Sequence, residues 1–248
     1  MHRQVTYKLW IAYDGTGFNG WQRQGNAPTI QLFLEQAIEA CWKAKYAIVG
    51  SGRTDAGVHA LQQVAHLRAS QKFKPDMLVR ALNHHLPPQV RVLRAAMASS
   101  SFHARFSATG KEYLYRIANE PFIHPFEVNR AHHVPRPLDI QAMQDAAHHL
   151  IGEHDFAAFT SNPGYKRAST VRRIDSIRIA KRKGIVTLRF RGNGFLYRMV
   201  RNIVGALIQV GLGRMKASAI SQILVSRKRS EAPNTAPACG LYLARVFY

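Results

Sequence analysis

Apolar residues in the first hundred positions change between the two-residue period of strands and the wider spacing of amphipathic helices. Every second residue between 4 and 13 is apolar, which predicts a strand. Helical spacing begins after Thr29, a typical N-cap residue, and again near Asp76. Short apolar runs predict strands on both sides of residues 50–57 and over residues 89–97. The order strand–helix–strand–strand–helix–strand is that of ferredoxin-like units.

The second half of the chain also combines helices with strands, without repeating the sequence of the first half. Alternating residues predict strands over residues 110–117, 171–180, 185–191 and 241–247. Helical patterns run from the cap residue Asp139 to Gly152, from Phe195 to Val210 and from Ala217 to Val225. The serine-rich segment 99–109 separates the halves, so we predict an N-terminal domain over residues 1–101 and a C-terminal domain over residues 102–248. The expected fold class is α+β.

The loop between the two central strands of the first half holds a carboxylate among glycines. It reads Gly50-Ser51-Gly52-Arg53-Thr54-Asp55-Ala56-Gly57. Glycines let the backbone approach a ligand closely. The chain has only 14 acidic residues against 35 basic ones, which suits a protein that binds a polyanion. The surface of such a protein should avoid negative charge, so a carboxylate in this loop suggests a chemical role for Asp55. The alternative is an ordinary tight turn, in which the aspartate bonds its own backbone.

The formal net charge is +21, and 46% of the residues are hydrophobic, as in a folded protein. Basic residues are spread from Arg3 to Arg245, which favours a basic face over a basic tail. Such a charge points to nucleic acid or an anionic membrane surface as the partner. Residues 18–24 mix aromatic rings, amides and a cation, a combination suited to exposed bases. The same residues would also suit a surface loop anchored by Trp21.

No segment is expected to enter or cross a membrane. The longest apolar stretch, residues 195–212, contains two arginines and an asparagine. The N-terminus lacks the apolar region of a secretory signal. Cys41 and Cys239 are far apart and outside any CxxC pattern, so a reducing compartment fits. We therefore expect a cytoplasmic protein.

Familiar cofactor and metal motifs are missing from the sequence. There is no GxxxxGK[ST] loop, no GxGxxG opening a helix after a strand, no HExxH and no HxE…PCxxC. Adjacent histidine pairs point in different directions, so no metal site is expected. What remains suits chemistry on a nucleotide without a cofactor: Asp55 as nucleophile or base, an arginine, and an aromatic ring that stacks on the base. Arg53 should keep Asp55 ionised, and a base inside structured RNA would have to be flipped out.

Five segments resemble the motifs of tRNA pseudouridine synthases of the TruA type. They are YDGTGFNGWQRQ (13–24), GRTDAGVHA (52–60), FHARFSATGKEYLYRI (102–117), GNGFLYRMVRNIVGALIQVGLG (192–213) and APACGLYL (236–243). They occur in the order of the family and span nearly the whole chain. The resemblance implies a pseudouridine synthase fold, in which two ferredoxin-like α/β halves join in a central mixed, mainly antiparallel sheet with a cleft between them.

The resemblance also implies roles for single residues. Asp55 corresponds to the catalytic aspartate, the nucleophile of the reaction; attack at C1′ of the ribose, addition to C6 of uracil and abstraction of a ribose proton all remain open. Tyr113 corresponds to the aromatic residue that stacks on the target uracil and takes part in proton transfer at C5. Arg201 corresponds to an active-site arginine that pairs with the aspartate. Arg53 is expected to contact the RNA backbone or the base-flipping region.

The implied activity is tRNA modification by an isomerase. Uridines 38, 39 and 40 in the anticodon stem-loop of tRNA would become pseudouridine in a redox-neutral reaction that needs no cofactor and no metal. The implied assembly is a homodimer.

Two other classes of function remain as alternatives. A non-catalytic RNA-binding protein or RNA chaperone would explain the charge and the aromatic residues, but it would not need the loop around Asp55. A membrane-surface or scaffold protein would need a basic amphipathic helix. The best helical segment, residues 195–210, has glycines and core-like residues that favour burial instead.

Overall fold

The computed structural model describes residues 4–162, 164 and 168–248. These residues form two compact units. Unit 1 contains the chain up to Thr109 together with Tyr242–Tyr248, and unit 2 contains Gly110–Leu241. The division thus falls later in the chain than the predicted boundary at residue 101. Sequence patterns did not predict that the last strand returns to unit 1, because that assignment depends on strand pairing between distant parts of the chain.

The first part of unit 1 has the ferredoxin-like order predicted for it. Its strands are β1 (Val5–Tyr13), β2 (Ile48–Gly50), β3 (His59–Ala69), β4 (Val90–Ala98) and β10 (Leu241–Phe247). Within the sheet β1 lies between β4 and β3, and β2 pairs with the far end of β3; all these pairs are antiparallel. β10 lies parallel to the start of β3, with Tyr242 opposite His59. The sheet of unit 1 is therefore mixed and mainly antiparallel.

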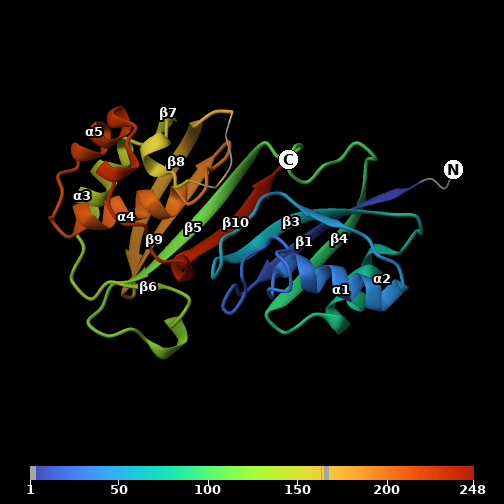
Figure 1. Cartoon of the computed structure of the whole chain (residues 1–248). Helices are drawn as coiled ribbons and strands as arrows, with labels where there is room; N and C mark the ends of the chain where they lie inside the picture. The colour runs from blue at the N-terminus through green and yellow to red at the C-terminus, as the bar shows by residue number, and fades with distance from the viewer. Residues whose placement is uncertain (1–3, 163, 165–167) are drawn as a thin grey trace. The chain divides into compact units, whose positions relative to one another are not determined.

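Helices α1 (Ile30–Trp42) and α2 (Pro75–His85) lie together on one face of this sheet (Figure 1). Thr29 is the N-cap of α1, as predicted, and its hydroxyl accepts a hydrogen bond from the Leu32 N–H at 3.4 Å. Tyr7, Leu9 and Ile11 of β1 are fully buried. Tyr7 faces the helices, because its hydroxyl bonds the backbone of Phe73 just before α2. The core of unit 1 therefore lies between this sheet face and the two helices.

Unit 2 has an antiparallel sheet in the order β5-β9-β8-β7. Its strands are β5 (Gly110–Ala118), β6 (His132–His133, parallel to β5), β7 (Gly152–Asp155), β8 (Val171–Arg182) and β9 (Ile185–Gly192). Its helices are α3 (Ile140–His148), α4 (Met199–Gly211) and α5 (Ala219–Ser226). Short 3₁₀ helices occupy residues 125–127, 157–159, 229–231 and 238–240. Both units combine helices with a sheet, which confirms the α+β class.

Two predicted helix boundaries in unit 2 are wrong. α4 begins at Met199 instead of Phe195, because Arg198 adopts a left-handed conformation with φ of 58° that a helix interior does not allow. α3 ends at His148 instead of Gly152. Gly152, with φ of +108°, begins β7. Asp139 caps α3 as predicted, by accepting from the Ala142 N–H at 2.9 Å.

α4 is the central helix of the unit 2 core, with Asn202 among its fully buried residues. Close packing with α3 is visible at Gly211, where an added Cβ would lie 2.8 Å from the sulfur of Met143. Among the described residues, no helix has the length and apolar character needed to cross a membrane.

Candidate active site

The loop that carries Asp55 is a tight turn between β2 and β3 of unit 1. The Val58 N–H donates to the Asp55 carbonyl oxygen at 3.1 Å, and Gly57 has φ of +74°, which favours glycine. Asp55 itself is half-buried, whereas Arg53 and Ala56 on the same loop are exposed. The turn therefore places a carboxylate at the surface on a backbone that is fixed locally.

Residues 13–24, predicted as a turn and a base-binding loop, form the support of the Asp55 loop. The Trp21 N–H donates to the Thr54 carbonyl at 3.1 Å, and the Gly57 N–H donates to the Phe18 carbonyl at 3.2 Å. Gly20 must be glycine here, because its φ is +84° and an added Cβ would clash with the Thr54 carbonyl oxygen. Two sequence motifs that are separate along the chain thus form one local structure.

Side chains hold the loop on both sides of Asp55. The Tyr13 hydroxyl lies 2.9 Å from the Thr54 hydroxyl, and both residues are buried. Burial raises the pKa of Tyr13 to about 12, so the phenol stays protonated and neutral at physiological pH. On the other side, the Ser51 hydroxyl donates to the Gln63 side chain at 2.6 Å, and Gln63 donates to the Gly52 carbonyl at 3.0 Å.

His59 closes the loop at the first residue of β3. It is 2% exposed, and its ring stacks on Tyr242 with 4.6 Å between the centroids. Its Nδ1 accepts from the Gly15 N–H at 3.0 Å, which places the proton of the neutral ring on Nε2. Asp14 Oδ1 is 3.1 Å from the same nitrogen and also accepts from the Thr16 N–H. An ion pair with Asp14 forms only when the ring is protonated, and Nδ1 then donates to the carboxylate instead of accepting from Gly15.

Arg53 is attached to a chain of amide side chains. Its Nε donates to Gln22 Oε1 at 3.2 Å, and Gln22 Nε2 donates to Gln31 Oε1 at 2.8 Å. Gln31 in turn donates to Glu35 on α1 at 3.1 Å and to the Ile48 carbonyl at 2.9 Å. The exposed guanidinium of Arg53 is therefore oriented by α1.

Tyr113 lies on β5 of unit 2, opposite Phe190 of β9. It is half-buried, and its ring meets Phe195 edge to face, with 5.1 Å between the centroids and 81° between the planes. Tyr115, on the same face of the strand, is fully buried and donates from its hydroxyl to the Pro237 carbonyl at 2.8 Å. Tyr113 is therefore the more accessible of the two tyrosines.

Arg201 lies in the first turn of α4, where the backbone of a following segment holds it. Its Nε donates to the Ala236 carbonyl at 2.8 Å, and the Ala236 N–H donates to the Arg201 carbonyl at 3.1 Å. Asn202 fixes the same segment, because its side-chain oxygen lies 2.6 Å from the Thr235 hydroxyl. The conformation of Arg201 thus depends on the packing of residues 234–236 against α4.

The four residues singled out in the sequence divide between the units. Arg53 and Asp55 share one loop of unit 1, whereas Tyr113 and Arg201 lie on β5 and α4 of unit 2. The pairing of Arg201 with Asp55 stays a prediction. Tyr13, Gln63 and His59 were missed as supporting residues. A polar residue within an apolar strand can indicate a buried hydrogen bond, but the partners of these three residues became clear only from the fold.

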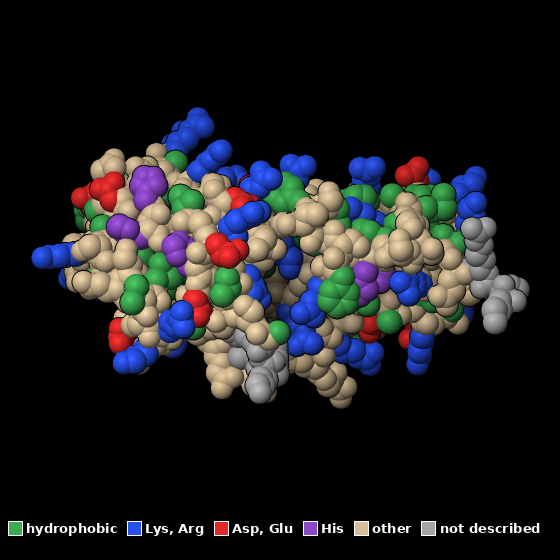
Figure 2. Space-filling view, turned by 90° about the horizontal axis from the view of Figure 1, so that it is seen from above, with side chains coloured by type: hydrophobic (Ala, Val, Ile, Leu, Met, Phe, Trp, Pro, Cys, Tyr) green, Lys and Arg blue, Asp and Glu red, His purple; other side chains and the backbone are tan. Residues whose placement is uncertain are grey.

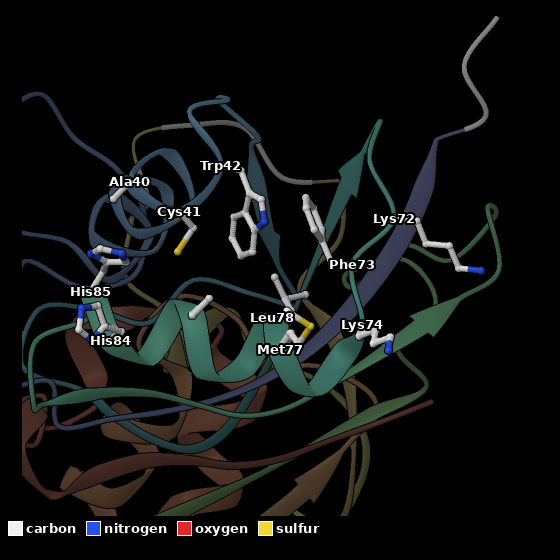
Figure 3. A pocket seen from close by; sticks show the side chains of 11 residues that line it. Ala40, Cys41, Trp42, Lys72, Phe73, Lys74, Met77, Leu78, His84 and His85 are labelled. Atoms are coloured by element: carbon white, nitrogen blue, oxygen red, sulfur yellow. The ribbon is translucent and has the colours of Figure 1, made fainter.

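A largely apolar pocket of unit 1 lies away from these four residues (Figure 3). This pocket of about 500 Å³ opens between the end of α1, residues 72–74 and the length of α2. The rings of Trp42 and Phe73 lie in it with 4.5 Å between their centroids, and none of the four residues above lines it. Within the described ranges, no group of three or more His, Cys, Asp or Glu side chains could hold a metal ion.

Comparison with known proteins identifies the family. The family model described as tRNA pseudouridine synthase matches residues 9–107 and 146–248. The chain is 47% identical over 244 residues to tRNA pseudouridine synthase A of Methylacidiphilum infernorum, covering 98% of this chain and 96% of that protein. It is 44% identical over 241 residues to tRNA pseudouridine synthase A 2 of Bacillus anthracis, covering 97% of this chain and 98% of that protein.

Similarity to solved structures is more distant. A crystal structure of a Cbf5–Nop10–Gar1 complex matches with a TM-score of 0.35 and 12% identity, over 95% of this chain and 57% of that one, and so distant a likeness adds nothing to the assignment. The family model covers most of the chain and includes the Asp55 loop, Arg201 and the residues that support them. The chain therefore belongs to the tRNA pseudouridine synthase family.

Proposed function

We propose that this protein converts uridine to pseudouridine at positions 38, 39 and 40 in the anticodon stem-loop of tRNA. Membership of the family makes it an isomerase, and its relatives are named for action on tRNA. The observation that carries the proposal is the Asp55 loop. The loop that carries this half-buried carboxylate is held by Tyr13, by Gln63 and by the backbone of residues 18–21, and an oriented arginine lies on the same loop. An ordinary turn would not need this support.

The proposed reaction balances without a cofactor. Asp55 makes the N1–C1′ bond labile, either as a nucleophile that attacks C1′ or adds to C6, or as a base that removes a ribose proton. The N1–C1′ bond breaks, the uracil turns, and a C5–C1′ bond forms. The hydrogen at C5 leaves as a proton and N1 gains one, so nothing is oxidised or reduced. Chemistry of this kind needs a positioned carboxylate and a way to hold the detached base.

The other residues take supporting roles in this proposal. Tyr113 stacks on the target uracil, and its half-buried ring on β5 has the exposure that such a contact needs. Arg201, oriented by the Ala236 carbonyl, pairs with Asp55. Arg53, held at Nε by Gln22, contacts the RNA backbone or the base-flipping region. We further propose that the enzyme works as a homodimer in the cytoplasm.

Tritium release from tRNA labelled at C5 of uridine tests the reaction. Forming the bond at C5 must expel that hydrogen, so the wild type should release tritium and Asp55→Asn should not. Asp76→Asn is the matched control, because it removes the same charge from an exposed position at the start of α2. Binding of tRNA by Asp55→Asn should persist. Absence of release from the wild type would favour a non-catalytic RNA-binding protein, and equal release from Asp55→Asn would remove Asp55 from the chemistry.

Position specificity needs a separate substrate series. tRNA carrying cytidine in place of the uridines at positions 38–40 should yield no pseudouridine, whereas restoring one uridine should restore one modification. Modification outside the anticodon stem-loop in this series would overturn the positions proposed but leave the isomerase assignment intact.

A further inference from the structure

A stripe of aromatic rings and cations runs over the sheet face of unit 1 that α1 and α2 leave uncovered. Tyr7 points to the helices, so Lys8 and Trp10 point to the other face by the alternation of a strand. We call this set the aromatic–cation stripe; its members are Lys8, Trp10, His66, Arg94, Phe102, His103, Phe106 and Tyr248. None of them is acidic. On the face seen in Figure 2, Lys and Arg side chains are more prominent than Asp and Glu.

Neighbouring members of the stripe are in contact along its length. The Lys8 ammonium lies 3.6 Å from the ring centroid of Tyr248 and 5.1 Å from that of Phe102. Arg94 lies 4.7 Å from the ring of Trp10. At the other end, Phe102 meets His66, His66 lies 4.7 Å from His103, and His103 lies 4.4 Å from Phe106. The stripe is therefore continuous from β1 to the loop 102–107.

The loop at the end of the stripe holds an exposed aromatic ring on a well-bonded backbone. Phe106 is 76% exposed, and its ring lies against His103. The N–H groups of Arg105 and Phe106 both donate to His103 Nδ1, at 3.2 and 3.3 Å. The Ala104 N–H donates to His66 at 3.1 Å, and Tyr248 donates to the Ala104 carbonyl at 2.7 Å. Because the Phe106 ring is mostly in solvent, the hydrogen bonds that fix this loop do not serve to bury the ring.

The chemistry of the loop fits an unpaired nucleotide. An exposed planar ring can stack on a base of any identity. The exposed guanidinium of Arg105 lies 5.6 Å from the centroid of the Phe106 ring, where it can meet the phosphate of a nucleotide stacked there. Arg68 and Arg94, both exposed, add positive charge along the same face. A protein or membrane partner would require a wider apolar surface than these rings, which are interrupted by cations.

We propose that the loop 102–107 is a second RNA-binding subsite, at which Phe106 stacks on an unpaired base of the substrate and Arg105 contacts its phosphate. The proposal rests on the proposed function in taking RNA as the substrate. His66, which supports the loop, lies seven positions after His59 on β3, or about 23 Å along the strand from the end of the Asp55 loop. The subsite therefore holds a part of the RNA away from the reacting uridine. Its contribution is to binding and not to the bond changes.

The test compares Phe106→Ala and Arg105→Gln with Phe122→Ala. Phe122 is 86% exposed in unit 2, so it controls for the loss of an exposed phenyl ring elsewhere. We expect Phe106→Ala to weaken tRNA binding about tenfold, within the range for one stacked base. Its dependence on salt should be unchanged, since no ionic contact is lost. Arg105→Gln should reduce the slope of log affinity against log salt by about 0.7 to 0.9, the value for one phosphate contact.

Rate measurements separate this subsite from the reaction centre. At saturating tRNA, Phe106→Ala should retain the wild-type kcat while its KM rises, and its Tm should match that of the wild type. Wild-type affinity in both Phe106→Ala and Arg105→Gln, with normal pseudouridine formation by the wild type, would overturn the subsite alone. Absence of pseudouridine formation by the wild type, with weaker RNA binding by Phe106→Ala, would overturn the proposed function and leave the subsite standing.

Discussion

At the scale of single residues, the hydrogen bond between Tyr13 and Thr54 fixes the residue that precedes Asp55. Both side chains are buried, so removing one hydroxyl leaves the other without that partner in the protein interior. We expect Tyr13→Phe to lower the free energy of unfolding by about 1–2 kcal/mol. We also expect kcat to fall more than KM changes, because Asp55 loses part of its support while the RNA contacts stay. Denaturant unfolding and steady-state kinetics measure both effects.

Tyr46→Phe is the matched control for that prediction. The Tyr46 hydroxyl makes a similar bond of 3.1 Å to Ser70, but in an exposed place. Loss of that bond should leave stability within about 0.5 kcal/mol of the wild type. If the two variants behaved alike, the buried contact with Thr54 would not be what positions the loop.

His66 gives the protein a pH dependence of stability. Burial, together with the nearby His103 and Arg68, holds the pKa of His66 below its usual 6.5. The unfolded chain therefore takes up a proton at a pH where the folded protein does not. The stability from this site is complete above pH 6.5 and is lost as the pH falls from 6.5 toward the lower pKa of the folded state.

His66→Gln should flatten that dependence. Glutamine offers an acceptor for the Ala104 N–H but does not titrate. The free energy of unfolding, measured from about pH 7 to about pH 5, should fall less steeply for His66→Gln than for the wild type. Other histidines are present in both proteins, so the difference between the two slopes reports His66. Equal slopes would show that His66 has the same pKa in the folded and unfolded states.

At the scale of elements, α4 controls Arg201 through the segment that packs on it. Gly205 of α4 faces this segment, and an added Cβ would clash with the Asn234 carbonyl oxygen. We expect Gly205→Ala to cost about 1–3 kcal/mol of stability by overpacking. Residues 234–236 should shift away from α4, so the Ala236 carbonyl would no longer hold Arg201 and kcat should fall. Thermal unfolding and tritium release from tRNA measure the two results.

Gly194→Ala serves as the control for the change at α4. A Cβ at Gly194 would meet Arg172 at no less than 3.7 Å, an ordinary contact. This variant should retain both its Tm and its activity. Full activity in a destabilised Gly205→Ala protein would show that Arg201 does not depend on the segment 234–236.

The sequence predicted helices and strands correctly where residues close together in the chain determine the structure. Thr29 and Asp139 cap their helices as predicted, and the alternating runs became β1, β8 and β9. Boundaries were missed where the deciding contact is distant. The left-handed conformation of Arg198 and the start of β7 at Gly152 depend on neighbours from other elements. Apolar spacing alone could not place them.

At the scale of the whole molecule, the net charge of +21 should dominate the binding of RNA. Each phosphate neutralised by Lys or Arg releases counterions, so affinity falls with salt. We expect tRNA affinity to drop at least about tenfold between 50 and 200 mM salt, the direction and scale expected for several phosphate contacts. Filter binding at a series of salt concentrations measures the slope. An affinity independent of salt would contradict a binding mode based on phosphate contacts.

Only part of the candidate site could be predicted from the sequence. Asp55 and Arg53 stand out because a carboxylate in a glycine loop is unusual in so basic a chain. Tyr113 and Arg201 came from resemblance to the family, since a strand tyrosine and a helix arginine look ordinary alone. The supporting groups Tyr13, His59 and Gln63 needed the fold, because their partners lie on other segments.

The pairing of β10 with β3 sets an order for folding during synthesis. Residues 242–248 supply unit 1 with the ring of Tyr242 against His59, the Phe247 carbonyl for the Thr109 N–H and the Tyr248 hydroxyl for Ala104. A ribosome making about 5–20 residues per second needs roughly 7 to 26 s to pass through residues 110–241 between the two parts of unit 1. During that time unit 1 of the nascent chain contains the Asp55 loop but lacks β10, while all residues of unit 2 are synthesised. The part of the protein that is translated first is therefore the part whose structure is completed last.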